Sequence, residues 1–253
     1  MSLREHLIEL RSRVVRAALG LLVGAVLGWV VSGRVMDLLF APILTIAAER
    51  HQEIAPNFAG VASPFDMKVR VAIFLGILLS SPWWIYQLWA FVTPGLTQRE
   101  RGYSIGFVAA AVPLFVGGAA LAWWVIPNAV ALLTLATPTG AVNLIDAQSY
   151  LTFVMQIILA FGATFLVPLF MVGLTLAGLV SGRVWLKAWR WSVVIAFVFA
   201  AVATPTPDVV TMFAVAAPIL VLYFAAVGIC LLHDHRAQRR RAAQELAADL
   251  GAR

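Results

Sequence analysis

Long stretches without a charged residue dominate this sequence and decide which folds it can adopt. A helix needs roughly 20 apolar residues to cross the hydrocarbon core of a bilayer. Hydrophobic residues make up 62% of the chain and charged residues 12%, whereas soluble domains have about 45–50% and about 25%. We therefore expect an integral membrane protein. The long stretches that lack Asp, Glu, Lys, Arg and His are residues 17–33, 71–98, 102–145, 147–182, 191–207 and 209–232.

These stretches predict an all-α membrane protein with six transmembrane helices. Residues 102–145 give one span, because Pro127-Asn128 and the turn residues that follow leave too little chain between them for a second crossing. Residues 147–182 give one long helix that bends near Pro168. One membrane domain is expected over residues 1–232, with a basic cytoplasmic tail over 233–253. The expected spans are about residues 14–33, 70–93, 103–126, 151–180, 188–203 and 209–232, the fifth being the shortest.

The positive charges predict the orientation of these spans. An even number of spans places both termini on the same side, and 14 of the 18 Lys and Arg residues fall on that side. Because cytoplasmic loops carry an excess of Lys and Arg, we expect both termini in the cytoplasm. The same distribution accounts for the net charge of +6, so nucleic acid is not an expected partner.

The residue patterns of an enzyme are absent from the sequence. There is no phosphate-binding Gly-x-x-x-x-Gly-Lys-Ser/Thr, no zinc-binding His-Glu-x-x-His and no Ser–His pair typical of a membrane protease. The single cysteine, Cys230, excludes an intrachain disulfide. His233 and His235 are spaced like a metal pair, but a helix C-terminus at the membrane interface explains them more simply. We expect no catalytic residue, no metal and no cofactor.

Polar residues gather in a few short segments, each with a plain structural explanation. Residues 2–5 match a capping box, which predicts a helix that runs from there into the first span, with Glu9 and Arg13 paired at i,i+4. Glu100 follows the Pro94 turn as a counter-ion between arginines. Asp208 caps the sixth span after a proline-driven outer turn. Asp66 is a helix N-terminal charge.

In their order along the chain, these segments resemble the TatC family, the C subunit of the twin-arginine (Tat) protein translocase. The resemblance covers residues 3–232 and is specific as an ordered set, although each motif alone is weak. The matching residues are His6-Leu7-Ile8-Glu9-Leu10-Arg11-Ser12-Arg13, Ala41-Pro42, Ala62-Ser63-Pro64-Phe65, Tyr86-Gln87-Leu88-Trp89-Ala90-Phe91, Pro94-Gly95-Leu96, Glu100-Arg101, Ser149-Tyr150-Leu151-Thr152-Phe153-Val154, Phe161-Gly162, Phe165, Pro168 and Thr204-Pro205-Thr206-Pro207-Asp208.

The resemblance implies a concave six-span bundle that acts as a receptor and not as an enzyme. Such a protein binds the twin-arginine signal peptides of folded cargo in the cytoplasmic (inner) membrane of a prokaryote. It exports that cargo with TatA- and TatB-like single-span partners, and an oligomer is expected. A signal's guanidinium pair favours a carboxylate at a partly desolvated site, and Glu9 and Glu100 match family positions implicated in signal binding.

The resemblance also implies three groups of site residues. Signal-peptide binding is expected at Glu9, Phe91, Pro94, Gln98, Arg99, Glu100 and Arg101. Partner contact at the outer turn is expected at Thr204, Pro205, Pro207, Asp208 and Met212. An outer-face structural motif is expected at Pro42, Ser63, Pro64 and Phe65.

The sequence departs from the family pattern inside the membrane. Leu166 follows Phe165 where the family usually has a glutamate, and Phe224 follows Tyr223 where a glutamate is also common. Met212 stands where a glutamine is often found. Partner contact here should therefore depend more on Thr204, Asp208 and apolar packing than on buried charge. The alternative function is a six-span small-solute transporter or permease subunit, which predicts internal repeats and polar residues at the membrane midplane.

Overall fold

Helices dominate the computed structural model, which divides into two compact units, residues 1–163 and residues 164–253. The structure describes residues 3–49, 54–58, 60–92, 101–135, 143–203 and 209–251. In chain order, the elements are α1 (Leu3–Glu49), β1 (Ile54–Asn57), α2 (Ser63–Leu79), α3 (Ser81–Val92), α4 (Arg101–Leu135), β2 (Asn143–Asp146), α5 (Ala147–Leu176), α6 (Gly182–Lys187), α7 (Trp189–Ala203) and α8 (Val209–Gly251).

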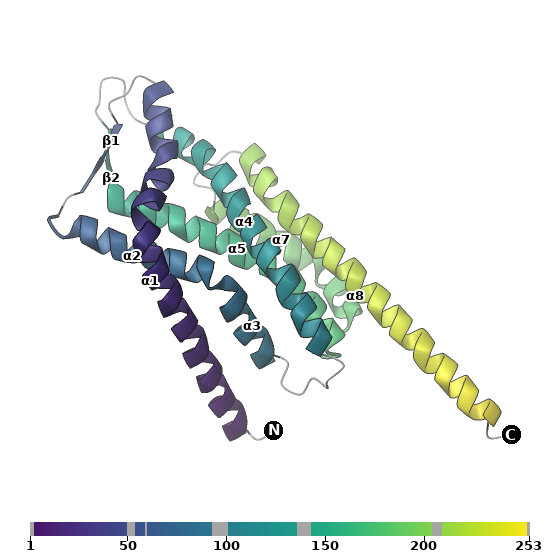
Figure 1. Cartoon of the computed structure of the whole chain (residues 1–253). Coiled ribbons are helices and arrows are strands. Elements are labelled where there is room, and N and C mark those ends of the chain that lie inside the picture. Colours follow the sequence, from purple (N-terminus) through teal and green to yellow (C-terminus); the bar gives the residue numbers. More distant parts are fainter. Residues whose placement is uncertain are drawn as a thin grey trace. The chain divides into compact units, whose positions relative to one another are not determined.

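In the first unit, α1 is the helix against which the others assemble. It packs along α2 and α3, and α3 packs in turn against α4 (Figure 1). The fully buried side chains come from all of these helices, with Ile43 on α1, Met67 on α2, Ile85 on α3 and Phe115 on α4. Where lipid is the alternative environment, such side chains stabilise a helix pair through van der Waals packing.

A sharp bend of 60° separates α2 from α3 at Ser80. Pro82 has no N–H, so the carbonyl four residues earlier has no helical donor and the helix cannot run straight through. The Ser80 hydroxyl donates to the Gly76 carbonyl at 2.6 Å, and the Ser80 carbonyl accepts from the N–H groups of Trp83 and Trp84. The second expected span is therefore a broken helix, whereas the sequence predicted one span over residues 70–93.

Two short strands add a feature that the all-α prediction lacks. β1 and β2 pair in parallel, with Ile54 opposite Asn143 and Asn57 opposite Asp146. At the end of β2 the Asp146 carboxylate accepts a hydrogen bond from the Ser149 N–H at 2.8 Å, which caps the start of α5. The hydroxyl and N–H of Ser149 hold the pKa of the Asp146 carboxyl below its usual value.

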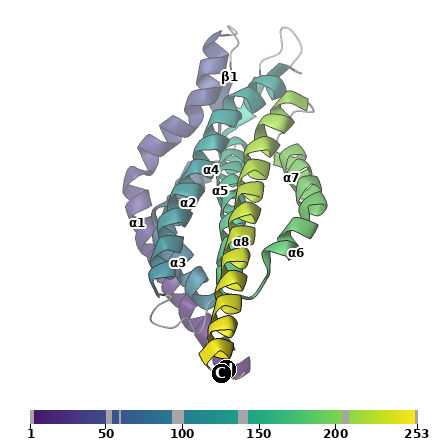
Figure 2. The same ribbon diagram turned by 90° about the vertical axis from the view of Figure 1, so that its right-hand side faces the viewer.

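The second unit consists of the C-terminal part of α5 with α6, α7 and α8. α6 and α7 lie along one side of α8 (Figure 2). α5 ends at Leu176, and Gly178 follows with φ of 73°, a left-handed conformation that glycine adopts without strain. Met171, Tyr223 and Val227 form the buried cluster of this unit, with Trp185 and Leu231 packed against it.

The helices match the sequence predictions unevenly. Four described helices are long and apolar enough to cross a membrane, or up to five if the bent α2–α3 pair counts as one span. α7 has 15 residues and falls below that length, so the count of six spans stays a prediction. α4 continues through Pro127 to Leu135, beyond the expected span of residues 103–126, while its part that is apolar enough to cross a membrane is Gly106–Pro127.

The prediction that the histidine pair lies at a helix C-terminus was wrong. His233 and His235 lie within α8, which continues to Gly251, and not at a helix C-terminus. Asp234 between them accepts a hydrogen bond from the Gly182 N–H at 2.7 Å, which ties the start of α6 to α8. Within the described residues, no group of three or more His, Cys, Asp or Glu side chains is arranged to hold a metal ion.

Candidate functional site

One face of α1 meets one face of α3 along an antiparallel seam, and the expected signal-binding residues Glu9 and Phe91 both lie on it. The His6 ring stacks on the Phe91 ring with 4.6 Å between the ring centroids. Further along α1, Arg13 Nη1 donates to Gln87 Oε1 at 3.3 Å. On α1, His6 and Arg13 lie two helical turns apart. Their partners on α3, Phe91 and Gln87, lie one turn apart.

We call His6, Glu9, Arg13, Gln87 and Phe91 the polar cluster. Arg13 is its centre, because its Nη2 also donates to Glu9 Oε1 at 3.1 Å. The Arg13 and Glu9 side chains expose 22% and 24% of their surface, and Gln87 is buried. An ion pair this desolvated is stronger than an exposed one, which contributes about 0–1 kcal/mol. The i,i+4 pairing of Glu9 and Arg13 predicted from the sequence is confirmed.

The polar cluster supplies one prediction about stability. We expect Gln87→Leu to lower the melting temperature in detergent, because it leaves a half-buried Arg13 N–H without its acceptor, at a cost of about 1–3 kcal/mol. Gln87→Glu retains an acceptor for Arg13 and should melt above Gln87→Leu. If both variants have the melting temperature of the wild type, the hydrogen bond from Arg13 to Gln87 does not stabilise the protein.

Close helix packing continues the seam beyond the polar cluster. Gly24 lies so near α2 that a Cβ there would stand 2.8 Å from the Gly76 carbonyl oxygen, and a Cβ on Gly28 would stand 2.8 Å from the Ala72 carbonyl oxygen. Small residues four apart allow helix backbones to approach in this way. The position of α1, and with it the polar cluster, is fixed by this contact.

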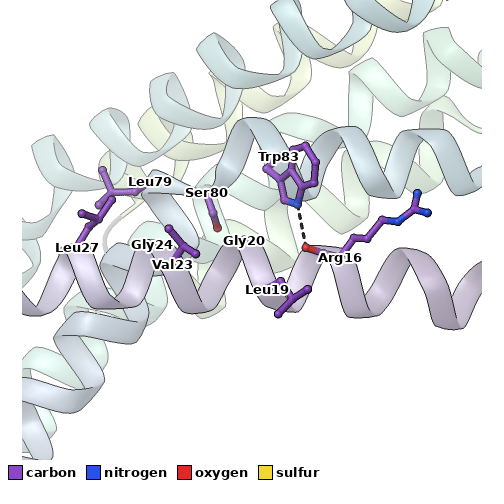
Figure 3. Close-up of a pocket in the computed structure, with 9 residues that line it drawn as sticks. All are labelled: Arg16, Leu19, Gly20, Val23, Gly24, Leu27, Leu79, Ser80 and Trp83. Atoms are coloured by element: carbon purple, nitrogen blue, oxygen red, sulfur yellow. Dashed lines mark hydrogen bonds between the residues drawn. The ribbon is translucent and has the colours of Figure 1, made fainter.

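An open and mainly apolar groove of about 490 Å³ lies between these two regions (Figure 3). Leu19, Val23 and Leu27 line it from α1 and Leu79 from the end of α2. The Trp83 indole N–H donates to the Arg16 carbonyl at 2.9 Å and closes one end (Figure 3). A polar cluster and an apolar groove thus follow one another along the same seam.

The structure describes few of the other expected signal-binding residues. Arg101 is the first residue of α4. Pro94, Gln98, Arg99 and Glu100 lie outside the described residues, as does the side chain of Arg101.

The outer turn lies almost wholly outside the described residues. Thr204, Pro205, Pro207 and Asp208 belong to this part of the chain, whereas Met212 lies half-buried in the first turns of α8. The structure therefore describes one of the expected partner-contact residues.

The outer-face motif begins α2. The Ser63 hydroxyl oxygen accepts from the Gly60 N–H at 3.1 Å, and Pro64 stands in the first turn, where a missing N–H costs no helical bond. Phe65 is exposed and meets the Trp29 ring edge-on, with 5.8 Å between centroids. Pro42 is buried inside α1.

Sequence reasoning missed a hydrogen-bond network beside this motif. Asp66 lies in the first turn of α2, as expected, and its Oδ2 accepts from Arg70 at 2.8 Å and from Gln148 at 2.7 Å. The i,i+4 spacing of Asp66 and Arg70 is visible in the sequence. The contact with Gln148 is not, because it joins residues 82 positions apart.

The two positions where the family commonly has a glutamate occupy different environments. Leu166 is buried within α5, where an apolar side chain avoids the desolvation cost of a carboxylate. Phe224 is half-exposed on α8 and packs edge-on against Tyr223, with 5.4 Å between ring centroids.

Comparisons with known proteins agree with one another. A family model described as Sec-independent protein translocase protein (TatC) matches residues 5–218. A protein of that description from Xylanimonas cellulosilytica is 52% identical over 242 residues, which cover 96% of this chain and 88% of that protein. Another, from Rothia mucilaginosa, is 36% identical over 243 residues, with 96% and 83% covered.

Two solved structures share the fold. A crystal structure described as the twin arginine translocase receptor TatC is 29% identical and has a TM-score of 0.71, covering 90% of this chain and 98% of that chain. A second crystal structure of that receptor, in DDM, is 28% identical with a TM-score of 0.73, covering 89% and 99%.

Proposed function

Because the chain belongs to the TatC family and is a multi-pass membrane component of a Sec-independent protein translocase, not an enzyme, we propose that it is the receptor and core subunit of a twin-arginine translocase. It binds twin-arginine signal peptides and exports folded cargo across the cytoplasmic membrane. Both termini then lie in the cytoplasm and six spans cross the membrane, in line with the distribution of Lys and Arg. The small-solute transporter has no support from the family match.

The polar cluster is the observation that carries the assignment of the binding site. Glu9 already holds one guanidinium, that of Arg13, at 3.1 Å in a half-buried setting. A signal arginine needs the same chemistry, a carboxylate whose charge-assisted hydrogen bonds are little weakened by water. Within the described residues, Oε2 of Glu9 makes no hydrogen bond, so this oxygen can accept a signal arginine while Arg13 keeps Oε1.

The order of surfaces along the seam supports the same proposal. A signal peptide carries positive charge before an apolar segment. The polar cluster is followed along α1 by the apolar groove of Figure 3, which has the same order of polar and apolar groups. Pro94, Gln98, Arg99, Glu100 and Arg101 are proposed to complete the site, with Glu100 as the second carboxylate.

Partner contact is proposed at the outer side of the membrane. The residues are Thr204, Pro205, Pro207, Asp208 and Met212. Lipid cannot satisfy polar groups below the membrane surface, so a short fifth span favours burial of this turn against a TatA- or TatB-like helix. We expect cysteines at Thr204 and Met212 to cross-link to co-expressed single-span partners. An assembled translocase with no cross-link at either site would leave Asp208 with a capping role alone.

Export in cells tests the function as a whole. In a bacterium that lacks its own C subunit, this chain and its cognate single-span partners should restore export of a folded reporter with a twin-arginine signal. The matched control is the same reporter with two lysines in place of the two arginines. Equal export of the two reporters would contradict the proposal. Export of neither reporter when all partners are present would contradict it as well.

A further inference from the structure

Gln87 is a buried polar side chain at the inner end of the polar cluster. It exposes only 3% of its surface, and its Oε1 accepts a hydrogen bond from Arg13 Nη1 at 3.3 Å. A carboxamide buried to this extent is out of reach of a peptide that binds at the protein surface. Any effect of Gln87 on signal binding must therefore pass through Arg13.

Contacts on both sides of Gln87 fix the position of its carboxamide. Four residues before it, the Trp83 indole N–H donates to the Arg16 carbonyl at 2.9 Å (Figure 3). Four residues after it, the Phe91 ring stacks on the His6 ring, with 4.6 Å between centroids. Residues four apart lie on one face of a helix, so α3 cannot slide along α1 without breaking both contacts. The acceptor oxygen of Gln87 is thereby held in register with Arg13.

Arg13 transmits this position to Glu9. A guanidinium is planar, so the direction of Nη2 is set once Nη1 is held by Gln87. Nη2 donates to Glu9 Oε1 at 3.1 Å, and the two side chains expose only 22% and 24% of their surface. A free glutamate side chain samples many rotamers, and this bond removes much of that freedom before a ligand arrives. Oε2 of Glu9, which makes no hydrogen bond within the described residues, is held in place with it.

A carboxylate held in this way favours a guanidinium over an ammonium group. The donors of arginine lie in a rigid plane, whereas lysine is a point charge with three rotatable donors. A rigid donor gains most from an acceptor that is already oriented, because little freedom is then lost on binding. A mobile carboxylate, in contrast, can follow an ammonium group as it moves. Orientation of Glu9 should thus strengthen binding of arginine more than binding of lysine.

We propose that Gln87 is a positioning residue, which acts through Arg13 to orient the Glu9 carboxylate and so sets the preference of the receptor for arginine over lysine. The inference rests on the proposed function, in which Glu9 binds a signal arginine. Gln87 carries no charge, so its replacement changes the orientation of Glu9 without changing the electrostatic attraction of the site. Replacement of Arg13 would change both.

Affinities of the purified full chain for two labelled signal peptides test this role. One peptide carries the two arginines and the other carries two lysines. Gln87→Leu removes the acceptor, and we expect it to weaken binding of the arginine peptide about three- to tenfold and of the lysine peptide by less than about twofold. Gln87→Glu keeps an acceptor at the same reach and should keep the wild-type ratio of the two affinities. The matched control is Gln148→Leu, which removes a hydrogen bond of 2.7 Å to Asp66 outside the polar cluster and should also keep that ratio.

The ratio of the two affinities separates positioning from a merely structural role. A loss of folded protein weakens binding of both peptides by the same factor and leaves the ratio unchanged. Gln87→Asn provides a second test if Gln87→Leu fails to fold, since it withdraws the same carboxamide from Arg13 by about 1.5 Å and should lower the ratio as well.

Three results would overturn the positioning role. They are a wild-type ratio in Gln87→Leu and Gln87→Asn, an equal loss of affinity for both peptides, and a ratio in Gln87→Glu as low as that in Gln87→Leu. A wild-type protein without any preference for arginine would contradict the receptor function itself, and the positioning role with it.

Discussion

Gly24→Leu should prevent α1 from docking on α2 and yield little folded protein. A Cβ at this position would stand 2.8 Å from the Gly76 carbonyl oxygen and 3.1 Å from the Gly76 Cα. These are backbone atoms, so no side chain can rotate away to make room. Even Gly24→Ala should cost about 1–3 kcal/mol through overpacking, and the larger side chain should cost more. The total stability of a protein is only about 5–15 kcal/mol.

Gly33→Leu is the matched control for this prediction. It lies on the same helix, and a Cβ there would meet nothing within 4 Å. We expect the control to melt near the wild-type temperature and to elute as a single species in detergent, whereas Gly24→Leu should aggregate or melt several degrees lower. Similar melting of the two variants would mean that the close approach of α1 and α2 does not hold the first unit together.

The second large effect is expected on signal-peptide affinity. Glu9→Gln and Glu100→Gln each replace a carboxylate by a neutral amide of the same shape. A hydrogen bond to a charged group contributes about 1.5–3 kcal/mol, so each variant should weaken binding about 10- to 100-fold. The double variant should weaken it further. Titration of a labelled twin-arginine peptide against purified protein measures these affinities.

Asp37→Asn controls for the loss of one negative charge, because Asp37 is exposed near the other end of α1. It should leave affinity unchanged. The melting temperatures of all variants must be compared as well, since Glu9 also binds Arg13 at 3.1 Å. Wild-type affinity in Glu9→Gln, Glu100→Gln and the double variant would remove both carboxylates from the binding site.

The sequence predicted the parts of the fold that local pattern controls. The N-terminal helix that enters the first span and the pairing of Glu9 with Arg13 are confirmed, because i,i+4 spacing is a local property. Pro127 lies within α4, which continues to Leu135. A proline frees one carbonyl, and neighbouring groups in a membrane protein can satisfy it without ending the helix.

The seam between α1 and α3 was harder to predict, although its signal is present in the sequence. Trp83, Gln87 and Phe91 recur every four residues on α3, and Gly20, Gly24 and Gly28 do so on α1. Each set of regularly spaced residues identifies one face of its helix, but it does not specify which other helix packs against that face. The pairing of β1 with β2 was beyond prediction for the same reason, since two strands of four residues carry no pattern that specifies a parallel partner far along the chain.

Binding of a twin-arginine signal peptide to the purified protein tests the central claim most directly. The measurement compares one labelled peptide with a variant in which both arginines are lysines. Lysine keeps the charge but lacks the planar fork that pairs with a carboxylate through two hydrogen bonds. We predict saturable binding of the arginine peptide and a loss of at least about tenfold in affinity for the lysine peptide. Equal affinity for the two peptides, or no binding of either by folded protein, would contradict a twin-arginine receptor.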